Sequence, residues 1–389
     1  MFVHNVWRWY IYLETVPKGR AGFPQGGTIV RGSKLASRNG GFPGRGFARS
    51  AAIGLMIAAG MILSTGLTGA VSAHHLTASG HSGAGTVVNP LVPDAKDKKS
   101  LKSFTVGEGP QWSAYDPVSH YLYIPESTAK QIQIFNTANK LVATISTGSE
   151  SYPFAAAFDG QNNWVYVTNF ASPGGVWVIS GKTIIHTISK DFNEPLGIAF
   201  DPGDGAMVVA NSGDNNVVFL VGELVAFVTP VGNDPFDVAY DPYWGNLVVT
   251  NLLSDNVSCV SAIVLNVVGS VPVGDSPAGI AFDPATDDDY VANLGGTNLT
   301  VIGGNCAFAG TSITGFDGPY SVAFQQSTLR MFVTNLDSTT TVAVSSSDKI
   351  VKTYTTGTES NGLAYSDYTN DMYVTVFDDG VGTTVEVIP

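Results

Sequence analysis

The chain has 389 residues, of which 13% are charged and 44 are glycine, and its formal net charge is −13. Residues 1–50 carry eight Lys or Arg against Glu14 alone, whereas residues 74–389 carry eleven basic and thirty-one acidic side chains. A surface of that sign repels phosphate backbones, which argues against nucleic acid as a partner. A chain with so few charges stays soluble through exposed Ser, Thr, Asn and Gly, as secreted or surface β-proteins do.

Three segments precede the repetitive part of the chain. Residues 1–50 form a basic extension without a sustained period, and a start codon assigned too far upstream accounts for it. Residues 51–73 carry no charge and end in small residues, as a signal peptide does, although a run of this length also fits an uncleaved membrane anchor. Residues 74–98, rich in Gly, Ser and Pro, predict a flexible linker. Both alternatives for 51–73 export the remainder to the cell surface or beyond it.

Candidate metal ligands lie in this linker and in two acidic runs. His74, His75 and His81 could capture copper or zinc, but three imidazoles on a flexible segment bear the full entropic cost of ordering. The carboxylates of 287–289 and 378–379 could bind Ca²⁺, yet hairpin-turn carboxylates of an acidic protein are more often solvated. We therefore predict no metal site and no cofactor.

A four-residue signature, best seen as YVTN at 166–169, returns at a pitch of 40 to 43 residues from residue 101 onward. Its seven copies end at Glu126, Asn169, Asn211, Asn251, Asn293, Asn335 and Val376. Sixteen residues before each end stands a proline, replaced by serine in the last repeat: Pro110, Pro153, Pro195, Pro235, Pro277, Pro319 and Ser360. A repeat of this length and β-rich composition predicts an all-β fold over residues 99–389, a seven-bladed β-propeller of four-stranded antiparallel blades.

Within each repeat, an alanine follows the proline position by four residues and an aromatic residue comes next, as in Ala199 and Phe200. Inner strands converge on the propeller axis, so we expect the alanine to lie towards the hub and the ring to fill the wedge between blades. Asp201 and its equivalents in the first five repeats predict a turn. The Asn that ends the signature is expected to adopt left-handed backbone geometry in the next turn.

The two ends of the repeat array predict how the ring closes. Residues 383–388 form a third strand and no fourth strand follows, whereas residues 101–106 match the fourth-strand segment 350–355. We therefore expect the N-terminal segment to complete the last blade and leave no open sheet edge there.

Two cysteines, Cys259 and Cys306, are too few for a disulfide scaffold. Their register places them on outer strands of neighbouring blades, which fan apart. A bridge stays open as an alternative in an oxidising compartment, but bridged Cα atoms must lie within about 7 Å, so we expect two free thiols.

The motif P-x-G-I-A-F-D followed by Y-V-T-N is clearest at 195–211 and 277–293. It resembles the repeats of YVTN-family β-propellers, found in archaeal surface-layer proteins and related bacterial secreted proteins, and the resemblance covers residues 101–389. The first and last copies depart from it, reading YIPE at 123–126 and YVTV at 373–376. The resemblance implies a cell-surface or secreted propeller that is non-enzymatic or uncharacterised, and it transfers no catalytic residues because the motif residues are structural.

An enzymatic alternative needs reactive groups around the axial channel. The propeller region holds His120 and His186, and neither has a partner at motif spacing; no G-x-S-x-G, H-E-x-x-H, C-x-x-C or phosphate-binding loop motif occurs. Propeller lactonases and lyases carry carboxylate or histidine ligands at the inner-strand mouths, where this chain has mostly proline. We predict no catalytic residues, and keep a secreted hydrolase or lyase acting on a small ester, lactone or glycan as the alternative.

A docking surface is predicted instead, from topology. The proline begins the first strand and the signature Asn ends the antiparallel second strand, so both lie on one face of the disc, with apolar residues beside them. An apolar ring of this kind is typical of a surface that binds protein or glycan. An equal alternative is that most of these side chains are buried under loops. The predicted binding residues are Phe154, Phe170, Phe236, Leu252, Leu294, Tyr320, Leu336 and Phe377. If they bind a partner, replacing Phe236 and Tyr320 by alanine should weaken binding and change stability by no more than about 1 kcal/mol.

Two glycosylation triplets fall at the same position of neighbouring repeats. Asn256 and Asn298 each stand five residues past the signature Asn, at the start of a predicted third strand. In an exported chain both are predicted glycan acceptors.

Overall fold

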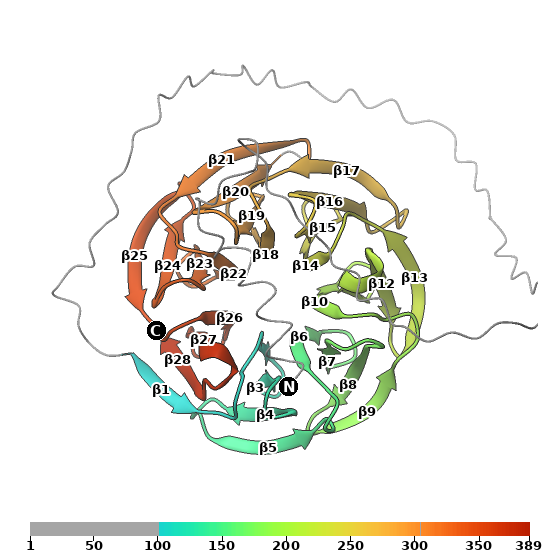
Figure 1. Ribbon diagram of the computed structural model, residues 1–389, viewed down its shortest axis with the longest axis vertical. Coiled ribbons are helices and arrows are strands. Elements are labelled where there is room, and N and C mark those ends of the chain that lie inside the picture. Colours follow the sequence, from blue (N-terminus) through green and yellow to red (C-terminus); the bar gives the residue numbers. More distant parts are fainter. Residues whose placement is uncertain (1–100, 304) are drawn as a thin grey trace, which may run out of the picture. The chain divides into compact units, whose positions relative to one another are not determined.

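The computed structural model describes residues 101–303 and 305–389. This part folds into seven four-stranded antiparallel sheets arranged around one axis (Figure 1), which confirms the predicted fold class. Its helices are the 3₁₀ turns η1 (Ser212–Asp214) and η2 (Asp378–Gly380). No helix formed by these residues is long and apolar enough to span a bilayer. The basic extension, the signal or anchor segment and the whole linker lie outside the described residues, so their boundaries stay predictions.

The strands follow one another from the hub to the rim within each blade. Blade 1 comprises β2 (Ala114–Asp116), β3 (Tyr121–Glu126), β4 (Gln131–Asn136) and β5 (Leu141–Ser146), and blade 2 comprises β6 (Pro153–Asp159), β7 (Trp164–Asn169), β8 (Gly175–Ser180) and β9 (Thr183–Ile188). Blade 3 comprises β10 (Pro195–Asp201), β11 (Ala206–Asn211), β12 (Asn216–Val221) and β13 (Leu224–Pro230), and blade 4 comprises β14 (Pro235–Asp241), β15 (Asn246–Asn251), β16 (Asn256–Ser261) and β17 (Val267–Pro272). Blade 5 comprises β18 (Pro277–Asp283), β19 (Asp288–Asn293), β20 (Asn298–Gly303) and β21 (Phe308–Thr314), and blade 6 comprises β22 (Pro319–Gln325), β23 (Arg330–Asn335), β24 (Thr340–Ser345) and β25 (Lys349–Thr355). Blade 7 comprises β26 (Ser360–Tyr365), β27 (Met372–Val376), β28 (Thr384–Ile388) and, at its rim, β1 (Lys102–Thr105).

The N-terminal strand closes the ring as predicted. β1 pairs antiparallel with β28, from Lys102 opposite Val387 to Thr105 opposite Thr384. The Phe104 ring packs against Phe135 of blade 1 at a centroid distance of 4.9 Å and against Tyr373 of blade 7 at 6.3 Å. The first and last blades are therefore joined by both backbone pairing and side-chain packing.

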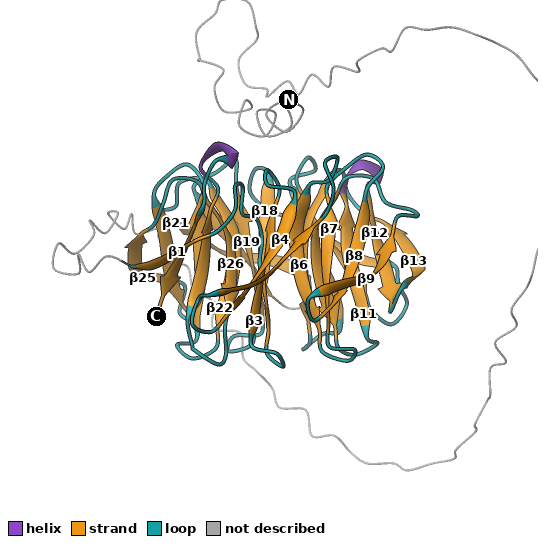
Figure 2. Cartoon of the chain, turned by 90° about the horizontal axis from the view of Figure 1, so that it is seen from below, coloured by secondary structure: helices purple, strands orange, loops and turns teal. Residues whose placement is uncertain are grey.

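The two faces of the propeller differ in what they carry. We call the face where inner strands begin and second strands end the proline/Asn face, and the opposite one the turn face. Figure 2 shows η1 and η2 on one face, and both follow second strands, so that face is the proline/Asn face. On the turn face, Asp201 accepts a hydrogen bond from the N–H of Gly203 at 2.8 Å, and the same bond recurs at Asp159 and Asp283. The predicted aspartate turns are thus confirmed.

The signature threonine, in blades that carry it, compensates for a bulge in the inner strand. In blade 4 the pairing of inner and second strands shifts register between Pro235 and Val238. The N–H freed at Asp237 donates to Thr250 Oγ1 at 3.0 Å, and that hydroxyl donates to the carbonyl of Ala278 in the next blade at 2.6 Å. The same relay runs through Thr168 in blade 2. The signature therefore couples neighbouring blades.

The signature asparagine does not adopt the left-handed geometry that we expected. Asn211 has φ −104° and lies fully buried, and its Oδ1 accepts the backbone N–H of Asn193 at 2.8 Å. Asn293 and Asn335 accept N–H groups of the equivalent loops, from Gly274 and Asp317. The side chain holds the loop that enters the inner strand, which needs an extended backbone at the asparagine itself.

The alanine and aromatic positions pack between blades. Ala199 belongs to the core shared with blade 4, whereas Phe200 packs on the core shared with blade 2. The alanine is therefore small because the next inner strand lies close, not because it points at the axis. The rings are only half-buried, and the fully buried rings are those of the second strands, such as Tyr166, whose hydroxyl donates to the carbonyl of Gly222 in the next blade at 2.9 Å.

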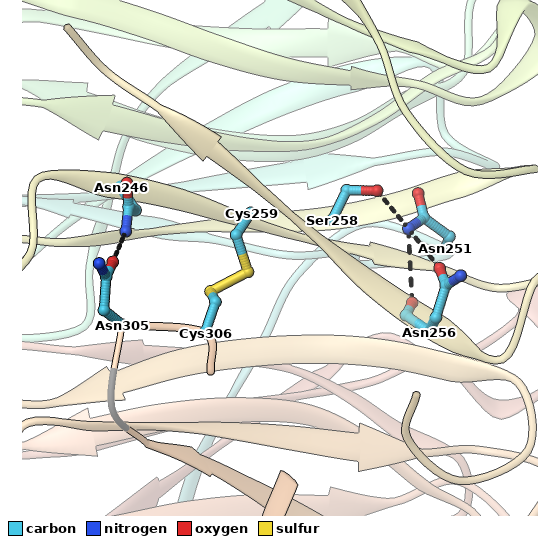
Figure 3. The surroundings of a disulfide bond; sticks show 7 residues. All are labelled: Asn246, Asn251, Asn256, Ser258, Cys259, Asn305 and Cys306. Atoms are coloured by element: carbon cyan, nitrogen blue, oxygen red, sulfur yellow. Dashed lines mark hydrogen bonds between the residues drawn. A yellow bond between two sulfur atoms is a disulfide. The ribbon is translucent and has the colours of Figure 1, made fainter. Parts of the chain in front are cut away.

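A disulfide joins blades 4 and 5, which corrects our expectation of free thiols. Cys259 in β16 is bonded to Cys306, with Cα atoms 6.3 Å apart (Figure 3). Cys306 lies in the turn between β20 and β21 rather than on an outer strand, and Asn305 beside it accepts a hydrogen bond from Asn246 of blade 4. The turn reaches across to the neighbouring blade, so the fanning of the strands does not separate the sulfurs.

Candidate functional site

The proline/Asn face is the candidate site, because each blade contributes two loops to it. The predicted docking side chains lie beneath these loops, not on them. Seven of the eight are at most 9% exposed, namely Phe154, Phe236, Leu252, Leu294, Tyr320, Leu336 and Phe377, and Phe170 is half-buried. The exposed apolar ring that we expected is therefore absent at these positions. Whether a partner binds above them stays a prediction.

The structure brings several of these side chains together across the axis. The Phe236 ring lies 5.6 Å from the Tyr320 ring and 6.1 Å from the Phe154 ring, between centroids. These residues each follow the repeat proline in blades 4, 6 and 2, where the inner strands converge. Contact across the axis removes the rings from water, which stabilises the hub. Leu252, Leu294 and Leu336 join the same cluster, and Phe170 packs on it.

Trp112 completes this hub and was missed from the sequence. Its ring lies 5.7 Å from Phe154, 5.7 Å from Phe236 and 5.6 Å from Tyr320, between centroids. A signal was present, since Trp112 is the one large residue at the second position after the repeat proline. The other repeats carry Ala155, Gly197, Asp237, Gly279, Ser321 and Gly362 there.

Among the residues at the second position after the repeat proline, Asp237 carries a carboxylate, and it is 8% exposed. Its Oδ1 accepts the N–H of Val238 at 2.8 Å, and its Oδ2 accepts the N–H of Ile280 in blade 5 at 3.0 Å. Burial raises the pKa of the Asp237 carboxyl to about 7, while the two hydrogen bonds lower it. Gly197 leaves the space for this carboxyl, because a Cβ there would lie 2.3 Å from Asp237 Oδ1.

Negative charge dominates the loops above the hub. The cations that the described loops of this face carry are Lys130 and Lys190. Lys130 Nζ lies 3.2 Å from the Tyr152 ring centroid, and burial lowers its pKa to about 8. The acids of the same loops are Glu108, Glu150, Asp191, Glu194, Asp214, Asp234, Asp255, Asp275, Asp317, Asp337, Glu359, Asp378 and Asp379. One sign of charge over a closed hub attracts cationic groups.

The predicted glycan acceptors lie at the edge of this face. Asn256 and Asn298 begin β16 and β20, as predicted, and both are half-buried. The Oδ1 of Asn256 accepts a hydrogen bond from Asn251 Nδ2 at 2.8 Å, and the Nδ2 of Asn298 donates to Ser312 at 2.9 Å. Glycosylation of either residue stays a prediction.

The two histidines do not belong to the hub cluster. His120, in the turn between β2 and β3, has its Nδ1 3.1 Å from the Tyr115 hydroxyl. His186, in outer strand β9, has its Nδ1 3.6 Å from a carboxylate oxygen of Glu223. Residues 101–303 and 305–389 contain no group of three or more His, Cys, Asp or Glu side chains arranged to hold a metal ion.

Comparisons with known proteins support the fold. No protein family matches the chain by sequence, and no curated protein does. Solved structures do match. The virginiamycin B lyase of Staphylococcus aureus superimposes with a TM-score of 0.64 at 12% identity, over 75% of this chain and 99% of the lyase. A streptogramin B lyase structure gives 0.64 at 10%, over 74% and 97%, and the hydrazine synthase of Kuenenia stuttgartiensis gives 0.62 at 16%, over 75% and 98%.

This chain is a seven-bladed β-propeller. At identities this low the likeness extends to the fold alone, because one fold hosts many unrelated functions. The function has to be argued from the residues of the proline/Asn face.

Proposed function

We propose that this chain is an exported propeller of the YVTN-repeat kind that acts as a non-catalytic interaction module at the cell surface or outside the cell. Its partner binds the proline/Asn face. The observation that carries the proposal is the run of acidic loops on that face, set above a hub closed by packed rings. A closed hub offers a surface for docking rather than an open channel for a substrate.

The chemistry of this face favours a protein partner that presents Lys or Arg side chains. Cationic groups gain from the summed field of carboxylates in the loops. The buried residues beneath, including Phe236 and Tyr320, hold the loops in position instead of contacting the partner. A glycan is the other partner class we predicted, and it becomes an outcome of the test.

Export is supported by two features. The Cys259–Cys306 disulfide is the kind of bond that persists in oxidising compartments. The uncharged run 51–73 provides a signal or an anchor.

Mass spectrometry of the native protein should find glycans on Asn256 and Asn298. If both sites are bare, the glycosylation part of the proposal is refuted.

Capture from the native cell envelope tests the docking face. Three baits are compared. The first is the native chain, and the second carries Asp317→Asn and Asp337→Asn on the proline/Asn face. The third is a matched control with Asp204→Asn and Asp367→Asn on the turn face. We expect one protein to be retained by the native chain and the turn-face variant, lost with the proline/Asn-face variant, and released by salt. Loss of capture after periodate treatment of the extract would indicate a glycan. Equal capture by all three baits would refute the proposal.

The lyase alternative is tested with the same preparation. Turnover of a streptogramin-type substrate by the purified chain would replace the binding proposal, since the staphylococcal enzyme shares the fold.

A further inference from the structure

Blade 5 has a carboxylate where the other blades have an apolar core residue. Asp289 stands four residues before the signature Asn, and it is 3% exposed. The equivalent residues are Leu122, Val165, Met207, Leu247, Met331 and Met372. The sequence predicts that the acidic run 287–289 is solvated, and for Asp289 this prediction is wrong. A buried carboxylate in a core position destabilises the fold unless a partner compensates for it.

Among the described residues, no hydrogen-bond donor or positive charge is found to compensate for the buried Asp289 carboxylate. The Oδ1 atom of Asp289 has no hydrogen-bond partner. Burial raises the pKa of the Asp289 carboxyl well above its usual range, and the neighbouring carboxylates of Asp241 and Asp288 raise it further. The sequence carries no Lys or Arg between Lys190 and Arg330, which spans all of blades 3, 4 and 5. An unsatisfied buried acid of this kind calls for a ligand that the polypeptide does not provide.

Strand pairing shows which blade interface Asp289 faces. Asp289 pairs with Phe282 and Ile302, and Ile302 belongs to the core between blades 4 and 5. Its side chain therefore faces blade 4, where Asp241 and Asn246 pair with each other at the end of the first hairpin. Asp241 is also buried, and its Oδ1 accepts hydrogen bonds from the N–H groups of Tyr243 and Trp244.

A turn of blade 5 contacts blade 4 at Asn246, the cross-strand partner of Asp241. Asn305, from the turn after β20, accepts a hydrogen bond from Asn246 Nδ2 (Figure 3). The Cys259–Cys306 disulfide holds that turn against blade 4. Strand pairing, this hydrogen bond and the disulfide thus place Asp289, Asp241, Asn246 and Asn305 along the interface between blades 4 and 5.

We propose that a divalent cation binds between blades 4 and 5, with Asp289 and Asp241 as its charged ligands and the amide oxygens of Asn246 and Asn305 beside them. Two carboxylates neutralise a divalent ion, and hard oxygen donors without His or Cys match Ca²⁺. The ion supplies the positive charge that blades 3 to 5 lack, and it ties two blades together next to the disulfide.

The test measures thermal unfolding of the purified chain after chelator treatment, with CaCl₂, MgCl₂ or NaCl added at equal ionic strength. We expect Ca²⁺ to raise the unfolding midpoint by several degrees, NaCl to have no effect, and calorimetric titration to show one Ca²⁺ per chain. Asp289→Leu, which restores the residue of blades 1 and 4, should abolish the Ca²⁺ shift and unfold at a higher temperature than the metal-free native chain.

Two further variants make the outcome specific. Asp289→Asn keeps the shape of the side chain and should weaken Ca²⁺ binding by about tenfold or more, because one of two charges is lost. Asp255→Asn, at an exposed position in the loop between β15 and β16 on the proline/Asn face, should leave the Ca²⁺ shift intact. A native chain that shows no Ca²⁺ shift, or a shift that persists in Asp289→Leu, overturns the proposal. Stabilisation by Asp289→Leu together with no effect of Ca²⁺ would also overturn it, because the buried carboxyl would then destabilise the chain without binding a cation.

Discussion

The residue after each repeat proline shows how position in the ring decides the role of a side chain. By pattern, Phe154, Phe236 and Tyr320 are apolar residues at the edge of a face, and this suggested a docking surface. The structure turns them towards the axis, where they contact one another and Trp112. The repeat pattern predicts where these residues lie in a strand, but not whether their side chains point to solvent or to the axis.

Phe236→Ala should therefore destabilise the propeller by about 3–5 kcal/mol, since it leaves a cavity in a ring cluster. This replaces the small change that an exposed docking residue would give. Phe227→Ala is the matched control, because that ring is 41% exposed on outer strand β13. Urea unfolding measures both variants, and equal midpoints for the two would show that the hub cluster carries no stability.

Asp237 makes stability depend on pH. Its pKa is about 7 in the folded chain against 3.8 for the ordinary group, so the folded state binds the proton more tightly than the unfolded state. The stabilisation from this proton is complete below pH 3.8 and is lost as pH rises to about 7. Asp237→Asn should flatten this fall relative to the native chain, measured by urea unfolding at several pH values. Asp255→Asn, at an exposed site, should leave the fall unchanged, and an Asp237→Asn profile parallel to the native one would contradict the assignment.

At the scale of elements, the repeat signature works between blades as well as within them. The strand pattern predicts the hairpins, but the hydrogen bonds from Thr250 and Tyr166 run to the next blade. The disulfide belongs to the same scale, since it joins a strand of blade 4 to a turn of blade 5.

Loss of the disulfide should lower the free energy of unfolding by about 4 kcal/mol, the chain-entropy value for a separation of 47 residues. Guanidinium unfolding of the native chain with and without reductant measures this. The double variant Cys259→Ser with Cys306→Ser should be insensitive to reductant and resemble the reduced native chain. A reductant effect that persists in the double variant would show that the bond is not its cause.

At the scale of the whole molecule, closure depends on one short strand. Removing residues 99–106 leaves β28 as an open edge and removes the Phe104 ring from between blades 1 and 7. A chain of residues 107–389 should lose ~3 kcal/mol or more relative to one of residues 99–389, because it loses a backbone ladder and a packed aromatic ring. Calorimetry compares the two chains directly. Identical unfolding midpoints would mean that the ring holds without this strand.

The sequence by itself determined the number of blades, the order of strands, the aspartate turns and the closing role of β1. The strands and turns follow from residues a few positions apart, whose spacing is set by strand and turn geometry. The blade count and the closing strand follow from comparing whole repeats along the chain. Only the tertiary structure decided that the apolar ring closes the hub, that Cys259 meets Cys306, and that Asp289 is buried. Each of these depends on distances between different blades, and such distances are set by how seven sheets converge on one axis rather than by the spacing of residues along the chain.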